Sequence, residues 1–318
     1  MEHIPVLADN VVELLAPAAG DGWIVDATLG RGGHAARLLD AAPSARLVGI
    51  DHDPVALEES RTNLGPRADR VRFVRGDFKD LASLLERLGI EKVRGVLLDL
   101  GVSSPQLDEA HRGFSYRIEG PLDMRMDPSQ RISAADVVNT YAPRDLERTI
   151  ATFGEERFAR RIARAIVANR PIETTTELAE VVKEAVPAAT RRTGPHPARR
   201  TFQALRMEVN AELDALRAVL PEAVDALEPG GRMAVISYHS LEDRAVKTHF
   251  RNEADGCTCP PDFPVCTCGA QARVRVLTRR PIRPREEEIE ANPRARAAKL
   301  RAVEKLAPPA TSPAEGPA

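Results

Sequence analysis

The chain has 318 residues, with 45 Lys and Arg against 47 Asp and Glu, so its formal net charge at pH 7 is −2. This balance excludes a globally basic protein, and any nucleic-acid-binding surface has to be local. No basic segment followed by an apolar run opens the chain, and no stretch is apolar for the length of a membrane span, which predicts a cytoplasmic protein.

The first hundred residues alternate short apolar runs with amphipathic helical patterns. We predict strands at 23–27, 46–51, 71–75 and 93–99, and helices at 33–41, 54–63 and 81–88. Strand–helix alternation with links this short predicts an α/β fold in which helices cover both faces of a parallel sheet.

The alternation stops after about residue 104 and resumes about a hundred residues later. We predict helices at 134–139, 143–153, 155–169 and 176–185, then a helix at 207–227, a strand at 232–237, a helix at 241–251 and a partly exposed strand at 273–278. The pattern therefore predicts a discontinuous α/β domain over 1–105 and 206–300, an inserted helical domain over 106–205, and a disordered Pro/Ala/Ser-rich tail over 306–318.

A glycine-rich loop follows the first strand. The segment 26–34 reads Asp-Ala-Thr-Leu-Gly-Arg-Gly-Gly-His, and its glycines let a ligand approach the backbone beside the exposed N–H groups of a helix. Asp51 ends the second strand about twenty residues later, where a carboxylate accepts hydrogen bonds from the ribose of an adenosine cofactor.

Two cofactors fit this pattern. Gly30, Gly32 and Ala35 formally satisfy the dinucleotide fingerprint of NAD. However, a carboxylate at Asp26 suits a cationic amino-acid cofactor and would repel a pyrophosphate, and Asp77 and Phe78 at the end of the third strand could meet an adenine. These features together favour S-adenosylmethionine. Taken one by one, they have simpler explanations, since the glycines could serve only a tight turn and the segment from Asp51 could serve only to cap the next helix.

The segment 99–106 (Asp-Leu-Gly-Val-Ser-Ser-Pro-Gln) follows the fourth strand, where amino-group methyltransferases orient their substrate. An exocyclic amine is a poor nucleophile that needs acceptors for its N–H bonds and in-line placement. Asp99, Ser103 and Ser104 could accept these hydrogen bonds and place the amine without a metal or a covalent intermediate. The Ser and Pro residues of this segment could equally form a turn with no catalytic function.

Here the chain resembles the RsmH (MraW) family, which methylates the exocyclic N4 of a decoding-centre cytosine in the 16S rRNA of the small ribosomal subunit. The motifs that carry the resemblance stand in family order at 3–7, 26–34, 49–54, 98–108, 112–116, 121–127, 201–206, 236–244 and 292–296. The resemblance implies a Rossmann-like class I methyltransferase sheet with an inserted helical domain, the assembled small subunit as substrate, and neither DNA nor a membrane as partner. It also implies cofactor contacts at Gly32, Gly33, His34, Asp51, Phe78, Asp99 and Gln106.

Several further residues are candidates for binding RNA or relaying a proton. An RNA base could stack on Phe114 or Tyr116, although burial of these rings in the protein would explain them equally well. RNA phosphates could bind two pairs of arginines in one loop, although these arginines could also be ordinary solvent-exposed residues. His239, after the fifth strand, could relay the amine proton or simply be a structural histidine. The arginines of that loop are Arg191, Arg192, Arg199 and Arg200.

All four cysteines lie together, in a C-x-C-x6-C-x-C pattern. Cys257, Cys259, Cys266 and Cys268 could hold one structural Zn²⁺ or remain free thiols. Two other functions stay open on the sequence: an NAD-dependent oxidoreductase, and a non-catalytic ribosome-assembly factor with a vestigial cofactor pocket.

Overall fold

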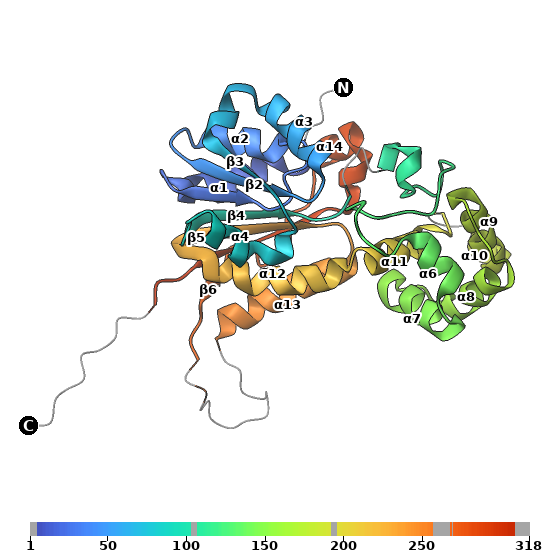
Figure 1. The fold of residues 1–318 in the computed structure, drawn as a ribbon. Helices are drawn as coiled ribbons and strands as arrows, with labels where there is room; N and C mark the ends of the chain where they lie inside the picture. Colours follow the sequence, from blue (N-terminus) through green and yellow to red (C-terminus); the bar gives the residue numbers. More distant parts are fainter. Residues whose placement is uncertain (1–4, 103–106, 192–195, 257–267, 269, 309–318) are drawn as a thin grey trace, which may run out of the picture. The chain divides into compact units, whose positions relative to one another are not determined.

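The chain forms two compact units. The computed structural model describes residues 5–102, 107–191, 196–256, 268 and 270–308 (Figure 1). Met1–Gly101 and Leu216–Ala318 form the sheet unit, and Val102–Ala215 form the helical unit. The second unit is inserted into the first, and the tail residues 309–318 lie outside the described residues.

A seven-stranded sheet organises the sheet unit, in the order β3-β2-β1-β4-β5-β7-β6. Its strands are β1 (Trp23–Asp26), β2 (Arg46–Asp51), β3 (Val71–Arg75), β4 (Val93–Asp99), β5 (Leu227–Ser237), β6 (Val274–Val276) and β7 (Lys299–Lys305). The pairings among the first five strands are parallel, whereas β7 pairs antiparallel with both β5 and β6. The predicted parallel α/β sheet is therefore confirmed for five strands.

The central strands are short continuous apolar runs because both of their faces are covered. Ile24 and Val25 of β1, like Leu97 and Leu98 of β4, have no exposed side-chain surface. Burial of each aliphatic side chain of this size contributes roughly 1.5–3 kcal/mol.

Helices cover the two faces of the sheet. Figure 1 shows α1 (Ala8–Ala19), α2 (Gly33–Ala41) and α3 (Pro54–Leu64) on one face, and α4 (Leu81–Arg87), α12 (Glu212–Ala226) and α13 (Ser240–Asp255) on the other. The 3-10 helices η1 (Gly65–Arg70), η2 (Phe78–Asp80) and η4 (Pro293–Ala297) and the short helix α14 (Glu286–Ala291) complete the unit. The sequence prediction missed α1, which contains Pro17, and also missed α14 and β7.

The helical unit is built from α6 (Ala134–Thr140), α7 (Pro143–Gly154), α8 (Ala159–Ala168), α9 (Thr175–Ala185), α10 (Ala188–Arg191), α11 (Arg199–Val209) and the 3-10 helix η3 (Ala110–Arg112). Its core is separate from that of the sheet unit and includes Ile150, Ile162, Ile166 and Leu178, none of which has exposed side-chain surface. Capping boxes begin α6 at Ser133 and α9 at Thr174.

One predicted helix is two. The pattern over 207–227 predicts a continuous helix, but α11 ends at Val209 and α12 begins at Glu212. Between them, Ala211 has φ 47°, which is incompatible with a right-handed helix. The apolar spacing continues across this break, so periodicity alone could not locate it.

Within the described residues, no helix has the length and apolar character needed to cross a membrane.

Candidate active site

Three carboxylates stand where adjacent parallel strands end. Asp26 ends β1, Asp51 ends β2 and Asp99 ends β4, and β1 pairs with both of the other strands. The carboxyl ends of parallel strands meet at one edge of the sheet, which is where open α/β sheets bind ligands. The fold therefore gathers negative charge at this edge.

Asp26 is the most buried of the three, with 1% of its surface exposed. Its Oδ1 accepts a hydrogen bond from the Thr28 N–H at 3.2 Å, and its Oδ2 has no hydrogen-bond partner among the described residues. Burial raises the pKa of Asp26 to about 6; His34 and the Thr28 N–H oppose this rise, while the charges of Asp99 and Asp51 add to it. A buried carboxylate with an unpaired oxygen favours a cation beside it.

The glycine loop turns sharply between β1 and α2. Gly30 and Gly32 have φ values of 51° and 78°, which glycine adopts at little cost. The Gly30 N–H donates to Asp51 Oδ2 at 2.9 Å, so the loop is tied to the end of β2. Gly32 is the N-cap of α2, and Gly33 is its first residue.

His34 lies in the first turn of α2, 6% exposed. Its Nε2 is 3.4 Å from Asp99 Oδ2, an ion-pair distance at which the hydrogen-bond geometry is poor, and neither ring nitrogen has a well-formed hydrogen bond among the described residues. Burial lowers the pKa of His34, but Asp99, Asp26 and Glu288 outweigh it, so that the pKa is raised. A positive charge at this position is therefore stabilised by the surrounding carboxylates.

The end of β2 and the turn after β3 provide the other predicted adenosine contacts. Asp51 accepts a second hydrogen bond, from the Asp53 N–H to Oδ1 at 2.9 Å. Each of its two carboxylate oxygens thus accepts one backbone N–H and keeps a further lone pair for a ribose hydroxyl. Phe78 is half-buried at the start of η2. Asp77 caps η2 and pairs with Lys79 Nζ at 2.8 Å. The sequence prediction placed Asp77 and Phe78 at the end of the third strand, but β3 already ends at Arg75.

Asp99 is held on several sides. Its N–H donates to Thr28 Oγ1 at 2.7 Å, and its Oδ1 accepts a hydrogen bond from the Tyr238 hydroxyl at 2.9 Å. Neither contact follows from residue spacing, because Thr28 and Tyr238 come from the turns after β1 and β5.

His239 is the N-cap of α13. Its Nδ1 accepts a long hydrogen bond, 3.4 Å, from the Glu242 N–H, and its Nε2 lies 3.0 Å from Glu242 Oε1. This arrangement gives the histidine a structural function, and the proton relay stays a prediction.

Several predicted site residues lie outside the described residues. These are Ser103, Ser104 and Gln106 of the loop after β4, Arg192, and the first three cysteines, Cys257, Cys259 and Cys266. The last cysteine, Cys268, is described and exposed. The zinc and free-thiol alternatives therefore both stay open.

The predicted base-stacking residues take different positions in the helical unit. Phe114 is 6% exposed and belongs to the core of that unit. Tyr116 stacks on His196, with ring centroids 4.8 Å apart and an interplanar angle of 15°, and meets the edge of Phe202. One face of the Tyr116 ring is therefore already covered.

The predicted phosphate-binding arginines of this unit, Arg191, Arg199 and Arg200, are exposed. Two of them also brace the backbone, since Arg191 donates to the carbonyl oxygens of Val186 and Glu184, and Arg200 donates to that of Glu155. Binding of RNA to these residues stays a prediction.

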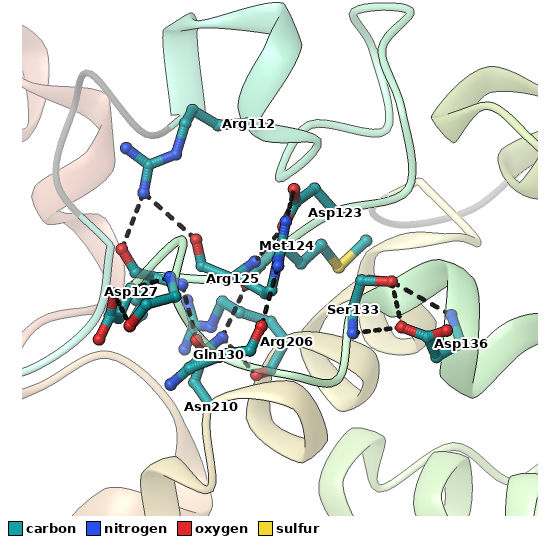
Figure 2. Close-up of polar contacts among 12 residues, drawn as sticks. Arg112, Asp123, Met124, Arg125, Asp127, Gln130, Ser133, Asp136, Arg206 and Asn210 are labelled. Carbon is teal, nitrogen blue, oxygen red and sulfur yellow. Dashed lines mark hydrogen bonds and ion pairs between the residues drawn. The ribbon is translucent and has the colours of Figure 1, made fainter.

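The segment 121–127 forms a braced loop in the helical unit (Figure 2). Arg125 pairs with Asp123 through Nε, 2.7 Å from Oδ1, and Arg112 donates to the carbonyl oxygens of Arg125 and Met126. Asn210 accepts from the Met126 N–H and donates to the Met124 carbonyl oxygen, both at 2.8 Å. Burial would raise the pKa of Asp123, but its bonds to Arg125 lower it. Asp123, Arg125 and Arg112 therefore form a network that braces this loop.

The site fits S-adenosylmethionine. Its α-ammonium group and its sulfonium are cationic. The carboxyl edge of the sheet presents Asp51, Asp99 and Asp26, whose buried Oδ2 has no hydrogen-bond partner among the described residues. Asp51 keeps acceptor capacity for ribose hydroxyls at the end of β2. A pyrophosphate would meet the same carboxylates unfavourably. Fold and site thus define a Rossmann-like class I methyltransferase that uses S-adenosylmethionine.

Comparison with known proteins narrows this class. The model of the MraW methylase family matches residues 1–306. The protein named ribosomal RNA small subunit methyltransferase H from Heliobacterium mobile is 52% identical over 309 residues, which cover 96% of this chain and 99% of that protein. The protein of the same name from Thermobifida fusca is 53% identical over 312 residues, covering 96% and 94%. The chain belongs to the MraW methylase family, and this membership excludes the NAD-dependent alternative.

Solved structures resemble the chain more distantly. A putative methyltransferase from Streptococcus mutans, in complex with SAH, has a TM-score of 0.43 at 13% identity and covers 96% of this chain and 100% of its own. A putative rRNA methylase from Clostridium thermocellum has a TM-score of 0.42 at 14% identity, covering 94% and 95%. Similarity at this level adds nothing to the functional argument.

Proposed function

We propose that the protein methylates the exocyclic N4 of a decoding-centre cytidine in the 16S rRNA of the small ribosomal subunit. The proposal rests on the sequence identity of 51–53%, over 96% of the chain, to relatives named ribosomal RNA small subunit methyltransferase H. With ribosomal RNA as substrate, the enzyme is expected in the cytoplasm.

The residues after β4 support transfer to an amine rather than to a ring carbon. A carbon-5 cytosine methylase needs a cysteine nucleophile beside the base. The segment 99–108 contains no cysteine, and the four cysteines of the chain all lie between 257 and 268. Direct transfer to an amine needs placement and acceptors instead, and Asp99 is an acceptor at this edge of the sheet.

We assign the chain's residues two tasks in this reaction. Asp26 and Asp51 hold the cationic and ribose parts of the cofactor, while Asp99, with Ser103 and Ser104, orients the amine and accepts its hydrogen bonds. When bound, S-adenosylmethionine would supply an electrophilic methyl group to the amine nitrogen, and its sulfur would keep the electron pair of the C–S bond. The amine then loses a proton, for which Asp99 and His239 are the candidate acceptors. The gain is mostly positional and electrostatic.

We also propose that the helical unit recognises the substrate. Exposed Arg191, Arg199 and Arg200 and the nearby aromatic pair of Tyr116 and His196 support this assignment, because phosphates select Arg and unpaired bases select aromatic rings.

Mass mapping of small-subunit RNA tests the proposal. RNA from cells that lack the protein is expected to miss one methyl group at cytidine N4, which the wild-type gene restores and the Asp51→Ala variant does not. Unchanged methylation in the deletion strain would refute the proposed target. If Asp51→Ala abolished cofactor binding and yet restored normal subunit assembly and growth, the non-catalytic assembly function would be favoured instead.

A further inference from the structure

Tyr238 lies directly after β5, in the turn that leads into α13. Its ring packs against the core of the sheet unit and lies beside Gly101, where a Cβ would come within 3.3 Å of the tyrosine Cδ2. Its N–H donates to Glu242 Oε2 at 2.8 Å, in the turn that the α13 capping box holds. The backbone and the ring of Tyr238 are thus both held by contacts that do not involve its hydroxyl.

The hydroxyl of Tyr238 is directed at Asp99. It donates to Asp99 Oδ1 at 2.9 Å, across the pairing of β4 with β5, in which Asp99 lies opposite Ile236. Burial raises the pKa of Tyr238 well above 10, and the charge of Asp99 raises it further. The hydroxyl therefore stays protonated and acts as a donor.

The other contacts of Asp99 leave its carboxylate rotation weakly defined. Thr28 holds the backbone of Asp99, and His34 approaches Oδ2 only at 3.4 Å with poor alignment. Among the described residues, the Tyr238 hydroxyl makes the closer contact to the Asp99 carboxylate, and this contact fixes how the carboxylate is turned at the sheet edge.

We propose that Tyr238 is a positioning residue for methyl transfer: its hydroxyl orients the Asp99 carboxylate toward cofactor and amine. The inference rests on the proposed role of Asp99. It assigns Tyr238 no contact with the reacting atoms, and it predicts that loss of the hydroxyl acts only through Asp99.

A double-mutant cycle tests this dependence. Tyr238→Phe keeps the ring and removes the hydroxyl, and it is compared in the wild-type chain and in the Asp99→Ala chain, where the acceptor of that hydroxyl is gone. The readouts are kcat at saturating S-adenosylmethionine on small subunits from the deletion strain, and the Kd of S-adenosylhomocysteine by calorimetry. We expect Tyr238→Phe to lower kcat about tenfold and to weaken binding several-fold in the wild-type chain, and to change each less than twofold in the Asp99→Ala chain.

Tyr141→Phe is the matched control. The Tyr141 hydroxyl also donates to a carboxylate, Glu208 Oε1 at 2.8 Å, but within the helical unit. This variant should leave kcat and Kd unchanged, and circular dichroism should show all variants folded.

Effects of Tyr238→Phe that are equal in both backgrounds, or smaller than twofold in the wild-type chain, would overturn the inference. If the wild-type enzyme methylates no small-subunit RNA, the proposed function fails, and the binding arm of the cycle still decides whether Tyr238 acts through Asp99.

Discussion

Asp26 gives a sharp prediction because its carboxyl is buried at a cost in stability. Its pKa is 3.8 in the unfolded chain and about 6 in the folded one, so the folded protein binds more protons between these values. Stability therefore falls as pH rises from about 4 to about 6 and stays lower above that. The difference between the two pKa values corresponds to about 3 kcal/mol.

Replacement of Asp26 by Asn removes this titration. The free energy of unfolding of Asp26→Asn, relative to wild type, is expected to rise by about 2 kcal/mol between pH 4 and pH 7, whatever constant cost the buried amide adds. Urea titrations at several pH values measure this difference. Asp21→Asn, which changes an exposed carboxylate of the same unit, is the control and should show no such trend.

The same variant should lose cofactor affinity. A cation beside Asp26 needs its ionised form, so the affinity of the wild-type protein for S-adenosylmethionine should fall up to tenfold per pH unit below about 6. Asp26→Asn should bind weakly at every pH in calorimetric titrations. A stability difference that does not change with pH, together with unchanged binding, would refute the reasoning from burial.

Three further substitutions probe the backbone. At Gly32, φ is 78° and an added Cβ would lie 3.3 Å from Leu64 Cγ, so Gly32→Ala should lower the free energy of unfolding by about 1–2 kcal/mol. The variant should also bind S-adenosylhomocysteine more weakly, as measured by calorimetry, and unchanged binding would show that Gly32 is not part of the cofactor site. Asn210→Ala should lower the free energy of unfolding by about 2–3 kcal/mol, because the Met124 carbonyl and its neighbours lose their partner; denaturant titration would contradict this if the loss were below 0.5 kcal/mol. Ala211→Gly should raise the melting temperature, since glycine relieves about 1 kcal/mol of strain at φ 47°, and a lower value would count against strain there.

The sequence by itself determined most of the sheet unit. Strands over 46–51, 71–75 and 93–99 and the helix over 33–41 were predicted with the observed bounds, because buried parallel strands are continuous apolar runs between glycine and helix-cap signals. Local pattern did not reveal β7, whose Lys299, Arg301 and Lys305 make it look like basic surface. Asp243 pairs with Lys299 and Arg301, and this partner lies in a distant part of the chain.

The candidate site divides in the same way. Asp26, Asp51 and Asp99 could be located from sequence because each ends a predicted strand, and parallel strands bring their carboxyl ends to one edge. Only the tertiary structure decided how those carboxylates are held: Thr28 and Tyr238 reach Asp99 from other turns, and Asp26 Oδ2 has no partner in the part of the chain that the structure describes. Burial sets the pKa of Asp26, and side-chain contacts set the orientation of Asp99. Both depend on packing between segments that lie far apart in the sequence, so residue spacing alone could not predict them.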